Sequence, residues 1–185
     1  MNKNYISLLL LSVCCLFSCN NPKQTTLPPY FSLPDYMNSQ IKILAANKTG
    51  AVKTISVNGK KEVHKFDILD WKEELQSFID ADINKPSWRG NFMLDTAYTV
   101  DKADTEKLIT YSTEEPGIRT KKLVLHFDIH TKNITEVEAY NLTDNVLYHF
   151  EQQLFYFPMK SYFISTTEKV VLLNPSQLNI RGEMK

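Results

Sequence analysis

Residues 123–142 read LVLHFDIHTKNITEVEAYNL, and their pattern is the strongest indication of the fold in this sequence. The stretch contains two runs in which apolar and polar residues alternate, separated by the polar segment Thr131-Lys132-Asn133. A period of two is typical of a half-buried β-strand, because successive side chains point to opposite faces of a sheet. The stretch therefore predicts a β-hairpin with one apolar face and one polar face.

The length of the turn sets the register of this hairpin. A two-residue loop would bury Glu136 and Glu138 beside Phe127 and Ile129, so the patterning favours a three-residue loop at 131–133. The predicted opposite pairs are His130–Ile134, Asp128–Glu136, Phe127–Val137 and His126–Glu138. This register gathers two imidazoles and three carboxylates on the polar face.

That polar face is the strongest candidate for chemistry. Its candidate metal or acid–base residues are His126, Asp128, His130, Glu136 and Glu138. Imidazole nitrogen and carboxylate oxygen form a donor set that zinc or iron accepts, and a close carboxylate pair can share a proton. The alternative is a solvated sheet face in which His126 and Glu138 form a favourable cross-strand pair.

Outward from the hairpin, alternation continues over most of the chain from Phe92 onward. The predicted strands are 92–100, 107–112, 119–130, 134–142, 146–157, 162–166, 169–173 and 178–181. Turn-forming segments such as Glu115-Pro116-Gly117 and Thr143-Asp144-Asn145 connect neighbouring strands. Short connections between successive strands predict an antiparallel meander.

Helical patterns precede these strands. Ser32, Pro34 and Asp35 indicate a capped helix start, with Phe31 and Tyr36 placed as a hydrophobic staple, and the apolar stripe ends near residues 47–50. A second helix is predicted from Asp70 to Lys85-Pro86, after a hairpin centred on Asn58-Gly59. We therefore expect an α+β fold, with two N-terminal helices packed on a curved antiparallel meander sheet of six or more strands.

The N-terminus has the pattern of a processed targeting segment. Lys3 precedes an apolar run that ends before Asn20, and the run is shorter than the about 20 residues that a membrane-spanning helix needs. At its end, Leu16-Phe17-Ser18-Cys19 resembles the lipobox of bacterial lipoproteins. The resemblance implies cleavage before Cys19, acylation of its thiol and membrane attachment through the lipid; the alternative is an ordinary cleaved signal peptide.

This interpretation divides the chain into a signal peptide (1–18), a polar tether (19–29) and one α+β domain (30–185). Removal of the signal takes away Cys14, Cys15 and Lys3, which leaves 20 basic against 21 acidic residues. No basic block or Gly-rich phosphate loop occurs, so neither a nucleic-acid partner nor a cofactor is expected. Asn20 after the acylated cysteine is similar to lipoproteins sorted to the outer membrane, which implies an envelope location facing the periplasm.

Three further features are candidates for interaction or modification. Trp88 and Arg89 follow the second predicted helix and form a candidate contact surface, although Trp88 can equally seal a sheet edge. Their segment, with WKEELQSFIDADINKP (residues 71–86), resembles uncharacterised lipoproteins of Bacteroidota, and the sequence Asp95-Thr96-Ala97 is similar to the O-glycosylation acceptor of that phylum. Aromatic residues at 148–163 can pack in the core or line an apolar binding surface.

Taken together, the sequence predicts a membrane-anchored envelope lipoprotein without an enzymatic activity. Its domain would bind a partner protein or an apolar ligand. The alternative is a metal-dependent or acid–base enzyme that uses the polar face around His126. No nucleophile motif such as G-x-S-x-G and no H-E-x-x-H zinc motif occurs in the sequence.

Overall fold

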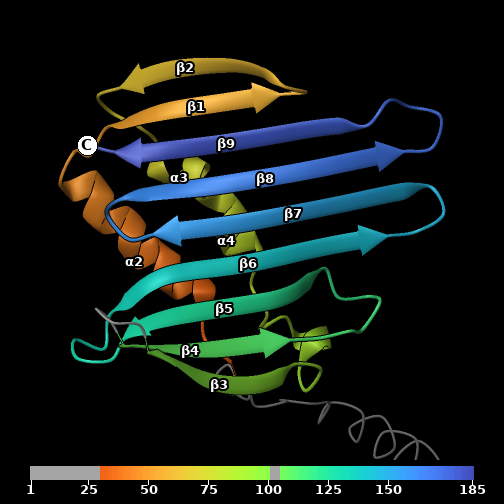
Figure 1. Ribbon diagram of the computed structural model, residues 1–185, viewed down its shortest axis with the longest axis horizontal. Coiled ribbons are helices and arrows are strands. Elements are labelled where there is room, and N and C mark those ends of the chain that lie inside the picture. Colours follow the sequence, from red (N-terminus) through yellow and green to blue (C-terminus); the bar gives the residue numbers. More distant parts are fainter. Residues whose placement is uncertain (1–29, 101–104) are drawn as a thin grey trace, which may run out of the picture.

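The computed structural model describes residues 30–100 and 105–185, and shows an antiparallel sheet of nine strands with helices on one face (Figure 1). The strands are β1 (Ala51–Val57), β2 (Lys60–Phe66), β3 (Met93–Val100), β4 (Thr105–Ser112), β5 (Thr120–Asp128), β6 (Ile134–Asp144), β7 (Tyr148–Phe157), β8 (Ser161–Val170) and β9 (Ser176–Met184). Their order is β2-β1-β9-β8-β7-β6-β5-β4-β3. The predicted α+β class and the meander are therefore confirmed, and β8 replaces the two short strands expected at 162–166 and 169–173.

The first helix, α2 (Leu33–Ala46), begins where the sequence predicts. The Ser32 hydroxyl oxygen accepts a hydrogen bond from the Asp35 amide and donates to the Asp35 carboxylate at 2.6 Å. Phe31 and Tyr36 contact each other across this start, with ring centroids 5.8 Å apart. The variant capping box and the hydrophobic staple are both formed.

The prediction of a second regular helix is wrong. Asp70 caps the start as expected, but the helix divides into α3 (Trp71–Glu74) and α4 (Gln76–Asp80), with Leu75 between them. Helical structure stops at Asp80 rather than at Lys85. The Asp82 carboxylate accepts a hydrogen bond from the Asn84 amide, a local contact that competes with further helical bonding. A short 3₁₀ turn, η2 (Pro86–Trp88), follows.

The hairpin of β1 and β2 is formed at Asn58-Gly59 as predicted, with positive φ values of 49° and 85° that this tight turn requires. It extends the meander, because β1 pairs along its length with the C-terminal strand β9. Gly50 and Lys185 also exchange two backbone hydrogen bonds, of 3.3 and 3.0 Å. Segments from the two ends of the described chain thus lie side by side in one sheet.

The helices α2, α3 and α4 lie behind the sheet in Figure 1, and the hydrophobic core fills the space between them and the sheet. Trp71 and Phe78 make edge contacts with the sheet residues Tyr162 and Tyr156, with ring centroids 6.4 and 5.8 Å apart. Every buried member of this core falls between Leu33 and Ile164. A chain that starts at Asn20 therefore retains the complete core.

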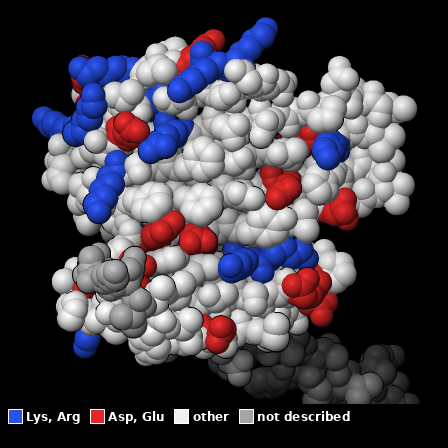
Figure 2. Space-filling view, in the orientation of Figure 1, with Lys and Arg blue, Asp and Glu red and all other residues white. Residues whose placement is uncertain are grey.

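None of the helices in the described residues covers the opposite face of the sheet, and we call it the open face (Figure 2). Basic side chains gather at its upper edge over β1 and β2, whereas acidic side chains lie near its middle. Lys60, Lys61 and Lys65 on the edge strand β2 contribute to the basic border, a feature that discourages pairing with another strand. No helix among the described residues has the length and apolar character needed to cross a membrane.

Candidate functional site

A β-bulge shapes the open face at the centre of the candidate site. Phe127 pairs with Ile134 and His126 pairs with Glu136, so Thr135 is an extra residue on β6. The Thr135 hydroxyl donates a hydrogen bond to Glu106 at 3.0 Å. Bulges often re-aim side chains beside functional sites, and this one directs neighbouring polar residues of β6 toward His126.

The predicted register of the hairpin is wrong. His126 lies opposite Glu136 instead of Glu138, and β5 ends at Asp128 so that Ile129 and His130 belong to the turn. The Asp128 carboxylate accepts hydrogen bonds from the amides of His130 and Thr131, at 2.9 and 2.6 Å. This side-chain capping competes with strand extension, and it outweighs the alternating pattern over the last two predicted residues.

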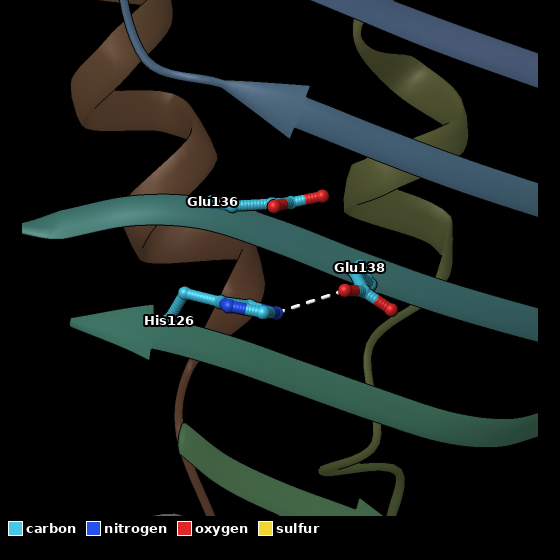
Figure 3. A group of neighbouring side chains, drawn as sticks. All are labelled: His126, Glu136 and Glu138. Atoms are coloured by element: carbon cyan, nitrogen blue, oxygen red, sulfur yellow. Dashed lines mark hydrogen bonds and ion pairs between the residues drawn. The ribbon is translucent and has the colours of Figure 1, made fainter. Parts of the chain in front are cut away.

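Three of the five candidate residues nevertheless come together. One ligand atom from each of His126, Glu136 and Glu138 can be chosen so that all three atoms lie within 4.8 Å of one another (Figure 3). Asp128 and His130 are not in this cluster, because their polar groups belong to the turn. The structure therefore retains three of the five predicted donors and leaves the second imidazole outside the cluster.

Both imidazole nitrogens of His126 contact carboxylates. Nε2 lies 2.8 Å from Glu138 Oε1, and Nδ1 lies 3.2 Å from Glu106 Oε2 on the neighbouring strand β4. The predicted pairing of His126 with Glu138 thus exists as a diagonal contact. Glu106 was missed because the predicted strand began at Lys107, whereas β4 begins at Thr105, and because the β4–β5 connection leaves the register between these strands open.

The carboxylates determine the protonation of this cluster. The hydrogen bond with Glu138, reinforced by Glu106, raises the pKa of His126 to about 9. The same hydrogen bond lowers the pKa of Glu138, whereas burial and the neighbouring carboxylates raise the pKa of Glu136. At neutral pH the cluster holds one imidazolium and carboxylates that outnumber it. It borders a depression of about 210 Å³ lined by Lys122, Val124, Glu138, Ala139, Tyr140, Gln153 and Phe155.

A second candidate site lies on the helix-bearing face, at the β3 edge. A hollow of about 380 Å³ is lined by Tyr98, Lys107, Ile109, Phe127, Asp128, Ile129 and Lys132. The strand pairing places the hollow on this face. Lys107 lies opposite Tyr98 on one side and opposite Phe127 on the other, so these three side chains share a face. Leu125, two residues before Phe127 on the same face, is buried in the core under the helices. In Figure 1, α2, α3 and α4 lie behind β5 and the strands above it, and none of them lies behind β3 or β4.

The charged groups of this hollow are two lysines and one carboxylate. Hydrogen bonds from Thr131 and His130 lower the pKa of Asp128, so that this carboxylate is ionised at neutral pH. Lys107 and Lys132 give the lining a net charge of one positive unit. Nothing in the alternating pattern predicts this hollow, because it depends on where the helices stop covering the sheet.

The remaining sequence candidates contribute no ligand to the cluster, although Phe155 lines the depression beside it and Thr96 pairs with Ile109 of the hollow. Trp88 is half-buried against the core and Lys85 Nζ lies 4.2 Å from its ring centroid, while Arg89 and Thr96 are exposed. Of the late aromatic residues, Tyr156 and Tyr162 are buried under the helices, whereas Phe155 and Phe163 pair on the open face with centroids 6.2 Å apart. The signal peptide, Cys19 and the tether fall outside the described residues.

Comparisons with protein-family models, with curated proteins and with solved structures found no match to this chain. Functional inference for the domain therefore depends on the chemistry of the two sites.

Proposed function

We propose that this chain is a lipid-anchored protein of the cell envelope whose domain binds a single-chain anionic amphiphile of the fatty-acid class. The lipobox at Cys19 supports the anchor, which we place at the outer membrane facing the periplasm. The observation that carries the ligand proposal is the hollow on the helix-bearing face, with its apolar walls and its lysines.

The size of the hollow favours one acyl chain. Its volume of about 380 Å³ lies at the lower end of the range for small-molecule sites, about 300–1,000 Å³. Ile109 and Phe127 pack against the core and form its apolar floor. Ile129 and Tyr98 remain 37% and 61% exposed, so an acyl chain that covered them would remove apolar surface from water.

The charge of the lining favours an anionic head group. Lys107 and Lys132 outnumber Asp128, and the Asp128 carboxylate already accepts two backbone hydrogen bonds from the turn. A carboxylate at the end of an acyl chain can therefore contact a lysine ammonium group while the chain lies on the apolar floor. A lipid-anchored domain would be held close to a membrane that supplies such amphiphiles.

Calorimetric titration of the chain that starts at Asn20 tests this proposal. The three probes share a twelve-carbon chain and are kept below their critical micelle concentrations: anionic dodecanoate, cationic dodecyltrimethylammonium and neutral dodecyl maltoside. We expect saturable binding of one dodecanoate and weaker binding of the other two. Lys107→Glu should weaken dodecanoate binding about tenfold, as expected for reversal of a partly exposed charge contact. The matched control Lys169→Glu, an exposed position on β8, should leave it unchanged.

Two results would contradict the proposal. One is the absence of saturable dodecanoate binding. The other is equal affinity for the anionic and cationic probes, which would show that the lysines do not select the head group.

A further inference from the structure

We propose that His126, Glu136 and Glu138 bind a divalent transition-metal ion of the zinc class on the open face, supported by Glu106 and Thr135. This site lies on the opposite face from the amphiphile hollow and does not depend on it. The proposal concerns metal binding alone and assigns no reaction to the ion.

The three ligands come from two adjacent, hydrogen-bonded strands. His126 belongs to β5, and Glu136 and Glu138 belong to β6. Their candidate donor atoms lie within 4.8 Å of one another, and His126 Nε2 is already 2.8 Å from Glu138 Oε1. Ligands about 2.0–2.2 Å from a zinc ion lie roughly 3.3 Å apart, so small side-chain rotations are sufficient to close the site.

Outer contacts orient the imidazole of His126. A histidine that binds a metal commonly donates its other ring N–H to a carboxylate, which fixes the tautomer and the orientation of the ring. Glu106 Oε2 lies 3.2 Å from His126 Nδ1, and Glu106 Oε1 accepts the Thr135 hydroxyl at 3.0 Å. Glu106 holds a proton on Nδ1, so a metal ion that displaces the Nε2 proton now shared with Glu138 would meet an Nε2 lone pair directed toward the side of Glu138.

Charge and access also favour a cation. Glu136 is half-buried, and no side chain in the described ranges donates a hydrogen bond to it. Glu106, Glu136 and Glu138 surround His126 with three carboxyl groups, and one imidazolium cannot neutralise all of their negative charge. Glu138 lines the adjacent depression on the open face, which leaves room for a water molecule in the remaining coordination position.

The donor set selects among metals. One imidazole nitrogen and two carboxylates suit Zn²⁺, with Mn²⁺ as a weaker competitor, whereas Mg²⁺ prefers oxygen ligands only. Because β-strands position all three ligands and the bulge places Glu136, the site is more rigid than one built on a loop.

The experiment is a calorimetric titration of the chain that starts at Asn20, which contains no cysteine, with ZnCl₂, MnCl₂ or MgCl₂. We expect one Zn²⁺ per chain and affinity in the order Zn²⁺, Mn²⁺, Mg²⁺. Glu136→Gln and His126→Ala should each weaken Zn²⁺ binding at least tenfold, and Glu106→Gln should weaken it about 10–100-fold as an outer-shell change.

A matched control is provided by His149, which also lies beside acidic residues: Asp144 at 3.2 Å and Glu151 at 4.0 Å. His149→Ala should keep the affinity of the unmodified chain. Because Glu136 holds no hydrogen bond that folding requires, Glu136→Gln should retain its circular dichroism spectrum and remains decisive if His126→Ala unfolds. No stoichiometric Zn²⁺ binding, unchanged affinity in Glu136→Gln, or an equal loss in His149→Ala would overturn the proposal.

Discussion

Replacement of Gly182 by alanine tests how tightly the helices and the sheet are packed together. Gly182 on β9 lies opposite Tyr162 on β8, and a Cβ at this position would lie 2.8 Å from the Tyr162 Oη and closer still to ring carbons Cε1 and Cζ. Tyr162 is fully buried, donates a hydrogen bond to Glu74 and makes an edge contact with Trp71. The ring must therefore move out of its position.

The magnitude follows from what Tyr162 loses. Overpacking of a core costs about 1–3 kcal/mol, a hydrogen bond to a charged group contributes about 1.5–3 kcal/mol, and an aromatic pair about 0.5–1.5 kcal/mol. These terms overlap, and alanine gains about 0.4–1 kcal/mol by restricting the unfolded chain. We expect Gly182→Ala to lower the free energy of unfolding by about 2–4 kcal/mol.

Urea denaturation followed by tyrosine and tryptophan fluorescence measures this change. Gly117→Ala is the matched control, because a Cβ there has no heavy atom within 4 Å and should change the stability by less than about 1 kcal/mol. In a Tyr162→Ala background, which removes the ring, Gly182→Ala should cost almost nothing. A loss below about 1 kcal/mol in the unmodified chain, or the same loss in both backgrounds, would show that the Tyr162 ring does not fill the space beside Gly182.

Three further predictions concern the site, the anchor and the core. The pKa of His126 is raised to about 9 from about 6.5, so its stabilising effect is complete below pH 6.5 and is lost as the pH rises toward 9. Urea titrations over this range should show that the free energy of unfolding falls by about 1–2 kcal/mol, a value reduced for solvent screening. If the pH dependence of His126→Gln runs parallel to that of the unmodified chain, this prediction is wrong. Cys19→Ser should abolish labelling by radioactive palmitate and membrane association, and the anchor prediction fails if either persists. Trp71→Phe removes the indole N–H that donates a buried hydrogen bond of 2.9 Å to the Thr49 carbonyl. Urea denaturation should show that the free energy of unfolding falls by about 1–3 kcal/mol. A loss below about 0.5 kcal/mol would show that water replaces this donor.

The sequence predicts those features of the fold that depend on local chemistry. Ser32 with Asp35 marks the helix start and Asn58-Gly59 marks the hairpin, because each signal acts over a few residues. The alternating pattern identifies the strands of the meander for the same reason. The break at Leu75 was not predictable in this way, because the apolar positions Trp71, Leu75 and Phe78 keep a helical spacing across it. The early helix end was missed because the apolar pattern does not reveal the contact between Asp82 and the Asn84 amide.

The candidate cluster shows the same division between local and long-range information. The residue types and their common face were predictable for His126, Glu136 and Glu138. The bulge at Thr135 and the contribution of Glu106 were not, because they depend on the register between three strands. Asp128 and His130 were assigned to the face only because the competing turn hydrogen bonds of Asp128 were overlooked.

The central claim is that the hollow at the β3 edge holds an anionic acyl chain. The most direct measurement is a methyl-labelled NMR titration with dodecanoate, in which Ile109 and Ile129 report on the hollow and Ile55 on β1 reports on a distant part of the sheet. We expect saturable shifts of Ile109 and Ile129 together with an unchanged Ile55 signal. Unchanged Ile109 and Ile129 signals, or equal shifts at all three positions, would contradict it.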